Sequence, residues 1–255
     1  MGTRVAVVTG AGQGIGLAIT HALRQDGWEV VGVELDPHAA DRLRGAIGTG
    51  NVVVGDVSAA DVLERARAAA ATLGTLHGWV NSAAICPRGT RVHDADLSLV
   101  RRVLEVNAVA SLHGAGLALA EYLRTGTPGA IVQISSIHGL RSFNGHPEYD
   151  MSKAAVEALV RNIAVGYGDR GIRANAIAPG AIRTPMYGAG VAAAGRDQAT
   201  ANTPLGRVGE PDDVAALATF LLSDAASYIT GEVVRIDGGW AASLAPREDD
   251  SCLSV

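Results

Sequence analysis

The segment Thr9-Gly10-Ala11-Gly12-Gln13-Gly14-Ile15-Gly16 decides the fold, because it joins a run of apolar residues to a stretch with helical spacing. Val5 to Val8 are all apolar, which predicts a strand buried on both faces, and residues 16–25 predict a helix. Glycines in such a turn let the backbone approach a phosphate, and the helix N-terminus offers free N–H groups and a positive dipole end. The segment therefore predicts a site for the pyrophosphate of a dinucleotide, formed by Gly10, Gln13, Gly14, Ile15 and Gly16. Because the spacing is G-x-x-x-G-x-G rather than G-x-G-x-x-G, a purely structural turn is the alternative.

Apolar runs and helical stretches alternate over most of the remaining chain. Further strands are predicted at residues 30–33, 52–54, 78–80, 130–134, 173–177 and 232–236. Strands separated by helices form βαβ units, whose right-handed crossovers place helices on both faces of a parallel sheet. No linker rich in proline, serine or charge interrupts the pattern. We therefore expect an α/β protein with a single doubly wound, Rossmann-like domain over residues 1–240 and a seven-stranded parallel sheet.

Two segments depart from this alternation. Residues 185–207 contain Pro185, three glycines before Arg196, and Pro204, so only weakly helical structure is expected there. A long connection after the end of a strand is usually functional, and we expect this one to cover a substrate. Residues 241–255 form a polar, acidic tail, which we expect to be poorly ordered.

Composition narrows the class of protein. Hydrophobic residues make up 48% of the 255 residues and charged residues 18%, which permits a large core and argues against disorder. The net charge is −5 without any basic block, so no nucleic-acid partner is expected. No apolar run reaches the roughly 18 residues of a membrane helix, and the apolar run near the N-terminus is too short for a signal peptide. The two cysteines, Cys86 and Cys252, suit a reducing compartment and form no ligand cluster, so we expect a cytoplasmic protein without a metal site.

Two carboxylates stand where predicted strands end. Glu34 lies 24 residues after Gly10, where a carboxylate can accept hydrogen bonds from the hydroxyls of an adenosine ribose and repel a 2′-phosphate. A solvated surface glutamate is the alternative. Asp56, followed by Val57, can meet an adenine amino group, or it can cap a helix that begins near Ser58.

The strongest candidates for chemistry are Tyr149 and Lys153, four residues apart in a helical stretch and therefore on one helix face. Interconverting an alcohol and a ketone requires a proton to be moved at the oxygen atom. A phenol with an ordinary pKa near ~10 is a poor base, but a cation one turn away favours the phenolate. The 21 basic residues are 20 arginines and Lys153, which indicates that a compact ammonium is needed at this one position. Ser135 and Ser136 end the fifth predicted strand, where a hydroxyl can orient a substrate oxygen or simply form a turn.

These motifs, which extend from Val5 to Gly239, together resemble the short-chain dehydrogenase/reductase family. The family's T-G-x-x-x-G-x-G is similar to residues 9–16, its Y-x-x-x-K to Tyr149 and Lys153, and its serine 13 residues before the tyrosine to Ser136. The resemblance implies a catalytic tetrad of Asn107, Ser136, Tyr149 and Lys153, in which Asn107 holds a water that relays protons to the lysine. It also implies that Tyr149 and Lys153 contact the cofactor, together with Pro179, Gly180, Ile182 and Thr184 of the family's P-G-x-x-x-T.

The family's N-N-A-G corresponds to Asn81-Ser82-Ala83-Ala84. Asn81, the cofactor-side residue, is kept, whereas Ala84 replaces a glycine and requires an ordinary φ. Glu34 stands in place of the more usual aspartate. The resemblance further implies a homotetramer, with interfaces formed by the long helices and by the end of the sheet near Trp240.

The sequence therefore predicts an NAD-dependent oxidoreductase that interconverts a secondary alcohol and a ketone by hydride transfer. NAD is expected rather than NADP, because the positions that could offset the charge of Glu34 are Gln13 and Leu35. Polar residues between Ser136 and Tyr149, and one after Ala84, predict a polar, oxygenated substrate; they include His138, Arg141, His146 and Arg88. The alternative is a sensor or scaffold protein that binds the dinucleotide without turnover, which would have no need for the complete tetrad.

Overall fold

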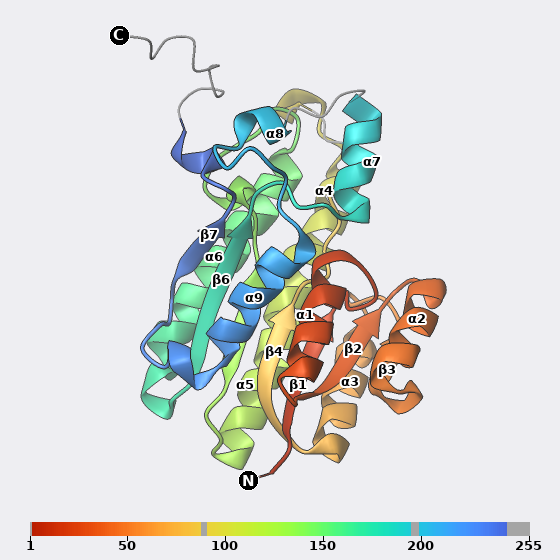
Figure 1. The fold of residues 1–255 in the computed structure, drawn as a ribbon, viewed down its shortest axis with the longest axis vertical. Coiled ribbons are helices and arrows are strands. Elements are labelled where there is room, and N and C mark those ends of the chain that lie inside the picture. Colours follow the sequence, from red (N-terminus) through yellow and green to blue (C-terminus); the bar gives the residue numbers. More distant parts are fainter. Residues whose placement is uncertain (1, 88–90, 195–198, 244–255) are drawn as a thin grey trace.

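A parallel sheet of seven strands forms the centre of the molecule (Figure 1). The computed structural model describes residues 2–87, 91–194 and 199–243. The strands are β1 (Arg4–Thr9), β2 (Glu29–Glu34), β3 (Val52–Val54), β4 (Thr75–Asn81), β5 (Ala130–Ile134), β6 (Arg173–Pro179) and β7 (Val233–Ile236). Each coincides with an apolar run of the sequence, and every pair of neighbouring strands is parallel. The predicted fold class is confirmed.

Helices cover both faces of the sheet, which explains why the strands do not alternate in polarity. The helices are α1 (Gly14–Gln25), α2 (Pro37–Ile47), α3 (Ala60–Leu73), α4 (Leu97–Leu104), α5 (Ala110–Thr125), α6 (Pro147–Tyr167), α7 (Pro185–Ala194), α8 (Ala199–Asn202) and α9 (Pro211–Leu222). Helices α1, α2 and α9 share one apolar core with the sheet, and α3, α5 and α6 share the other. In β1, for example, Ala6 belongs to the first core and Val7 to the second, and both side chains are fully buried.

The strand order β3-β2-β1-β4-β5-β6-β7 positions the site. From β1 the chain builds outward to β3 and then returns to β4 on the other side of β1. The register aligns the strand ends, since Thr9 pairs with both Val33 and Asn81. The loops after β1 and β4 therefore diverge and leave a crevice at the carboxyl edge of the sheet, where ligands bind in this fold.

Residues 185–194 and 199–207, the described parts of the segment 185–207, lie above this edge (Figure 1). They are more helical than the sequence predicts, because Pro185 takes the first position of α7, where proline is well tolerated. At the other end of the chain, Trp240–Ala242 form a 3-10 turn, whereas residues 244–255 of the predicted tail lie outside the described residues.

Residues Leu97–Thr125 form one long apolar helical stretch, made of α4, the π-helical segment Glu105–Val109, and α5. By length and composition alone this stretch is long and apolar enough to cross a membrane. Half of its apolar window is buried inside the protein, and α5 packs on the sheet, so the stretch is accounted for as a core helix.

Candidate active site

A cavity of about 720 Å³ opens at the carboxyl edge of the sheet. This volume lies within the range of small-molecule and cofactor sites. The loops after β1 to β6 all contribute to its walls, together with α7. The predicted site residues that line it are Gly10, Gln13, Gly14, Ile15, Gly16, Glu34, Asp56, Val57, Ser136, His138, His146, Tyr149, Lys153, Pro179, Gly180, Ile182 and Thr184.

The glycine turn after β1 has no room for side chains. Gly10 has a φ of +64°, and a Cβ there would lie 2.9 Å from the Cα of Ala83. A Cβ on Gly16 would lie 2.1 Å from the carbonyl oxygen of Gly10, so the helix can follow the turn this closely only with glycine. The first turn of α1 thus reaches the cavity with its backbone, which fits the pyrophosphate of a dinucleotide.

The carboxylate of Glu34 is buried and bound to the backbone. Its Oε2 accepts a hydrogen bond from Gly12 N at 2.8 Å, and its Oε1 accepts from Leu35 N at 2.8 Å and from Asp36 N at 3.0 Å. The side chain is only 5% exposed, so a solvated surface glutamate is excluded. A carboxylate has about four acceptor sites, and three are occupied here. Glu34 therefore both closes the glycine turn and keeps acceptor capacity toward the cavity.

Asp56 is held in place by Ser58 and by Arg102 of α4. Its Oδ1 accepts from both the N–H and the hydroxyl of Ser58, while its Oδ2 forms a short ion pair with Arg102 Nη2. Burial alone would raise the pKa of the Asp56 carboxyl, but these hydrogen bonds together with the guanidinium outweigh it, so the pKa is lowered. Arg102 lines the cavity and was not predicted, because nothing in the sequence pairs a helix residue with a strand end 46 positions earlier.

The Asn81 side chain, predicted to lie on the cofactor side, does not line the cavity. Its Oδ1 accepts from Trp79 Nε1 at 2.9 Å and its Nδ2 donates to Ser111 O at 3.1 Å, so the side chain points into the core beneath α5. The cavity is lined instead by the residues that follow it, Ser82 to Cys86. Thr9 holds this loop, because its hydroxyl oxygen accepts from the N–H groups of Ser82 and Ala83. Ala84 has an ordinary φ, as predicted.

Tyr149 and Lys153 face the cavity together from α6. The Lys153 Nζ atom lies 5.3 Å from the centre of the Tyr149 ring and donates to Ile134 O at 2.8 Å. Lys153 is only 3% exposed, and burial lowers the pKa of its ammonium to about 8. Burial also raises the pKa of the Tyr149 phenol, which a hydrogen bond with Ser136 partly offsets. Desolvation is the largest influence on the pKa of Tyr149, and the effect of the ammonium on the phenol stays a prediction.

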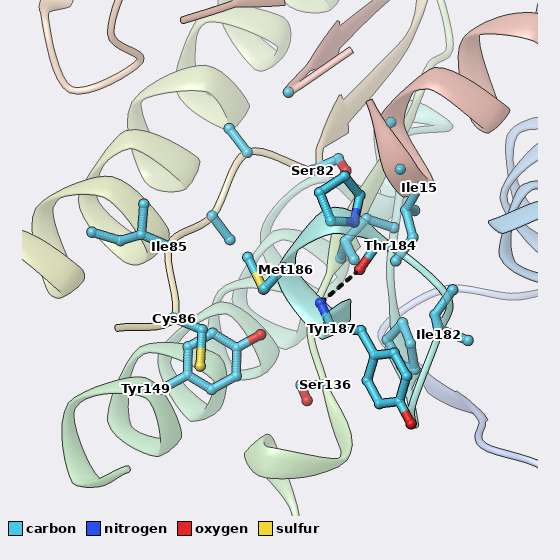
Figure 2. A pocket seen from close by; sticks show the side chains of 18 of the residues that line it. Ile15, Ser82, Ile85, Cys86, Ser136, Tyr149, Ile182, Thr184, Met186 and Tyr187 are labelled. Atoms are coloured by element: carbon cyan, nitrogen blue, oxygen red, sulfur yellow. Dashed lines mark hydrogen bonds between the residues drawn. The ribbon is translucent and has the colours of Figure 1, made fainter. Parts of the chain in front are cut away.

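The two serines after β5 have different roles. Ser136 lines the cavity, and Figure 2 shows it in the same space as Tyr149 and Tyr187. Ser135 is turned to α6, where its hydroxyl donates to Glu157 Oε1 at 2.8 Å. Ser135 also lines the cavity, but its hydroxyl is bound to Glu157, so Ser136 is the better placed of the two to meet a substrate oxygen.

Asn107 lies in the π-helical turn between α4 and α5 and does not line the cavity. Its side chain exchanges hydrogen bonds of 2.9 Å with the N–H and C=O of Ile85, and its Nδ2 also donates to Ser152 Oγ at 3.0 Å. Asn107 thus ties the loop after β4 to the helix that carries Tyr149 and Lys153. This places Asn107 as a positioning residue, and the predicted water relay stays a prediction.

The remaining wall of the cavity is mixed in polarity. His138 and His146 line it, as predicted, beside Phe143 and Trp240, which were not predicted. Arg141 was predicted to contact the substrate. This is corrected, because Arg141 is exposed on the loop after β5 and does not line the cavity. Arg88 lies outside the described residues.

Helix α7 closes the site from above. Thr184 Oγ1 accepts from Tyr187 N at 3.2 Å, which caps the first turn of α7 (Figure 2). Met186, Tyr187 and Gly190 of this helix line the cavity. The segment predicted to cover the substrate thus contributes side chains to the site.

The fold and the site define a dinucleotide-dependent oxidoreductase: a glycine turn at a helix N-terminus, a buried acid at the end of β2, and a serine, a tyrosine and a lysine around one cavity. Comparisons with known proteins agree. The family model described as enoyl-(acyl carrier protein) reductase matches residues 10–241. The chain is 36% identical to 2-(S)-hydroxypropyl-CoM dehydrogenase 3 of Xanthobacter autotrophicus, over 93% of this chain and 96% of that protein.

Two further similarities extend the comparison. The chain is 36% identical to galactitol 2-dehydrogenase (L-tagatose-forming) of Cereibacter sphaeroides, over 92% of this chain and 94% of that protein. Its structure is similar to the crystal structure of levodione reductase, with a TM-score of 0.87 and 31% identity over 94% of this chain and 98% of that one. The chain belongs to the short-chain dehydrogenase/reductase family. Together with the tetrad residues, this membership makes it an oxidoreductase that acts on CH–OH groups with a nicotinamide dinucleotide.

Proposed function

We propose that this protein is an NAD-dependent dehydrogenase that interconverts a secondary alcohol and a ketone on a polar, oxygenated substrate. The observation that carries the proposal is the burial of Tyr149 and Lys153 beside Ser136 in a cavity that the glycine turn and Glu34 also line. The glycine turn fits a dinucleotide, because Gly10, Gly14 and Gly16 line the cavity where α1 begins and its free N–H groups are available. When bound, the nicotinamide supplies or accepts the hydride.

The protein's own residues then handle the oxygen and the proton. Ser136 orients the substrate oxygen through its hydroxyl, and Tyr149 gives a proton to that oxygen during reduction or removes one during oxidation. Lys153 places a positive charge next to the phenol, which favours the phenolate at the moment the proton leaves. Asn107 fixes the position of the loop after β4 relative to α6, the helix that carries Tyr149 and Lys153.

The preference for NAD over NADP rests on the charges at the adenosine end. Glu34 repels a 2′-phosphate, and the neighbouring Gln13 and Leu35 offer no cation. At the adenosine end of the cavity the lining cation is Arg102, and it is already paired with Asp56. A second phosphate charge would therefore meet uncompensated negative charge.

The test is the ratio of kcat/KM for NAD and NADP with a panel of secondary alcohols. We expect NAD to be favoured at least tenfold, about 1.4 kcal/mol of transition-state binding. Glu34→Ala should narrow the ratio, chiefly by lowering efficiency with NAD, whereas Asp41→Asn should leave it unchanged. Asp41 suits the control because it lies on α2 outside the cavity and its substitution changes the net charge equally. Equal efficiency of the wild type with both cofactors would refute the NAD assignment, and silence with every alcohol would favour a sensor or scaffold.

Polarity of the substrate is supported by His138 and His146, which line the cavity. Buried polar groups without partners cost about 1–3 kcal/mol each, so a purely hydrocarbon ligand is disfavoured. Two relatives are named for polar compounds, galactitol and cis-4-hydroxycyclohexanecarboxylate. One relative is named for a 3β-hydroxysteroid, and a preference for bulky hydrocarbon ketones would therefore decide against this part of the proposal.

For assembly and location we propose a cytoplasmic homotetramer. Apolar side chains are exposed on the long helices, among them Leu112 of α5 and Val165 of α6, and Tyr228 is also fully exposed. Trp240, which was expected at an interface, packs on Phe143 within the same chain, so it gives no support to the tetramer. Light scattering at micromolar concentration should give four times the 26.0 kDa of one chain. Cys86 is a free thiol, which suits a reducing compartment.

A further inference from the structure

An imidazole and a carboxylate form a partly buried pair beside the catalytic tyrosine. His138 Nδ1 lies 2.5 Å from Asp150 Oδ1, and the two side chains are 18% and 14% exposed. His138 follows Ser136 by two residues, and Asp150 follows Tyr149 directly on α6. The rings of His138 and Tyr149 meet edge to face with centres 5.1 Å apart. The pair is therefore adjacent to the oxygen atom on which Tyr149 acts.

The pair fixes which nitrogen of His138 carries the hydrogen. A carboxylate only accepts hydrogen bonds. Nδ1 therefore carries the hydrogen and donates a hydrogen bond to Asp150. Burial lowers the pKa of His138 below its ordinary value, and Asp150 offsets this only in part. Lys153 and His146 oppose a second positive charge there, and the phenol of Tyr149 and the thiol of Cys86 stay neutral because burial raises the pKa of each. At neutral pH the imidazole is uncharged, and Nε2 is a bare acceptor.

The side chains around His138 include both apolar rings and a second imidazole. Phe143 stacks on the imidazole at 4.3 Å between ring centres, and Trp240 meets Phe143 edge to face at 5.8 Å. The ring of His146 lies 5.7 Å from that of His138, and its Nδ1 is buried without a hydrogen-bond partner in the described part of the chain. All four side chains line the cavity. Such a wall suits a carbon ring or chain that also carries a hydroxyl group.

We propose that His138 is a specificity-determining residue that accepts a hydrogen bond from a second hydroxyl of the substrate, one or two carbons from the reacting carbon. The substrate class is then a diol or polyol and the corresponding hydroxyketone. Asp150 is the positioning residue that fixes the tautomer of His138. The inference rests on the proposed function, since the reacting oxygen is the one held by Ser136 and Tyr149. A hydroxyl donates to neutral Nε2, whereas a carboxylate would need a protonated His138.

The test compares three alcohols with NAD: cyclohexanol, cyclohexane-1,2-diol and 2-hydroxycyclohexanecarboxylate. We expect kcat/KM for the diol to exceed that for cyclohexanol at least tenfold in the wild type. His138→Phe keeps an aromatic ring against Phe143 but removes the acceptor, so the diol-to-cyclohexanol ratio should fall toward one. Arg141→Gln is the matched control, because Arg141 lies in the same loop but is exposed and outside the cavity, and it should leave the ratio at the wild-type value. A wild-type ratio near one, or a carboxylate substrate preferred over the diol, would overturn the proposal.

Two further readouts separate tautomer control from simple packing. In the wild type the preference for the diol should weaken as the pH falls, because protonation of His138 removes the acceptor. Asp150→Asn can hydrogen-bond either tautomer, so it should reduce the ratio mainly through a higher KM for the diol. If the ratio of Asp150→Asn matches the wild type at every pH, Asp150 does not position the imidazole.

Binding separates this inference from the proposed function. In Tyr149→Phe loaded with NADH, calorimetry should give a Kd for the diol at least tenfold below that for cyclohexanol. If no alcohol is turned over by the wild type but this difference in Kd is present, the proposed function fails while the hydroxyl site stands. Equal Kd values overturn the hydroxyl site even if turnover is observed.

Discussion

Replacing Lys153 with methionine should stabilise the protein while abolishing its activity. Lys153 is 3% exposed, and burial brings the pKa of its ammonium from 10.5 to about 8. The folded protein therefore holds the charged lysine at a cost, which an apolar side chain of similar length does not incur. Catalysis needs the charge, so stability and activity are expected to change in opposite directions.

The magnitude follows from that shift. A displacement of about 2.5 pKa units corresponds to about 3 kcal/mol of destabilisation of the charged form. Against this, the methionine loses the hydrogen bond to Ile134 O and leaves that carbonyl without its partner, which costs about 1–3 kcal/mol. We expect a net gain of about 1 kcal/mol at pH 7, or about 2–4 °C in Tm.

The dependence on pH identifies the cause. Between pH 8 and pH 10.5 the unfolded chain binds more protons at Lys153 than the folded protein does, so the wild type gains stability as the pH rises through this window. The methionine variant lacks this gain, and its advantage should shrink over the same interval. Thermal unfolding at fixed protein concentration, from pH 7 to pH 10.5, measures both curves. Tyr149→Phe is the matched control, because it removes activity but retains Lys153, and it should follow the wild-type slope up to about pH 9, below the range in which the phenol titrates in the unfolded chain. Parallel curves for Lys153→Met and the wild type would show that Lys153 keeps an ordinary pKa.

Three further outcomes are expected. Tyr149→Phe should lower kcat by 10²-fold or more while the Kd for NAD, measured by fluorescence titration, stays nearly unchanged, since the hydroxyl acts on the substrate. Lys153→Arg should lower kcat on a similar scale, because a planar guanidinium cannot replace a compact ammonium in this buried position, and saturating NAD should protect Lys153 of the wild type from an amine-selective reagent. Gly12→Ala should raise the Kd for NAD, because its Cβ would lie 2.7 Å from Glu34 Oε2 and 2.8 Å from the Cβ of Ala39; an unchanged Kd would show that the turn can yield.

The cofactor half of the site could be predicted from sequence because its determinants are local. The glycine turn, the acid at the end of β2 and the pair Tyr149 and Lys153 each depend on spacing within one strand–helix unit. The direction of the Asn81 side chain could also be predicted, since side chains alternate along a strand. Asn81 therefore shares a face with Trp79, two residues earlier, whose large apolar ring belongs to the core under α5. That alternation could have indicated an inward direction.

The substrate half could not be predicted because its residues meet only in the folded chain. His138, Asp150 and Trp240 come from a turn, a helix and the end of the chain, and no local pattern brings them together. Arg102 illustrates the same point at the adenosine end, where α4 reaches across to Asp56. Spacing within a helix or strand gives positions on one element, whereas the composition of a cavity wall depends on how several elements pack.

Glu34 links the choice of cofactor to the shape of the glycine turn. A neutral apolar residue at this position removes the charge that repels a 2′-phosphate, but it also removes the acceptor of the N–H groups of Gly12, Leu35 and Asp36. Leaving a buried N–H unpaired costs about 1–3 kcal/mol, and Gly12 belongs to the turn at which we propose that the pyrophosphate of either dinucleotide binds. A change of charge alone therefore weakens binding of both cofactors. Efficient use of NADP should require a replacement that supplies an acceptor to Gly12 N together with a cation at Leu35, because only that combination keeps the turn closed while meeting the added phosphate.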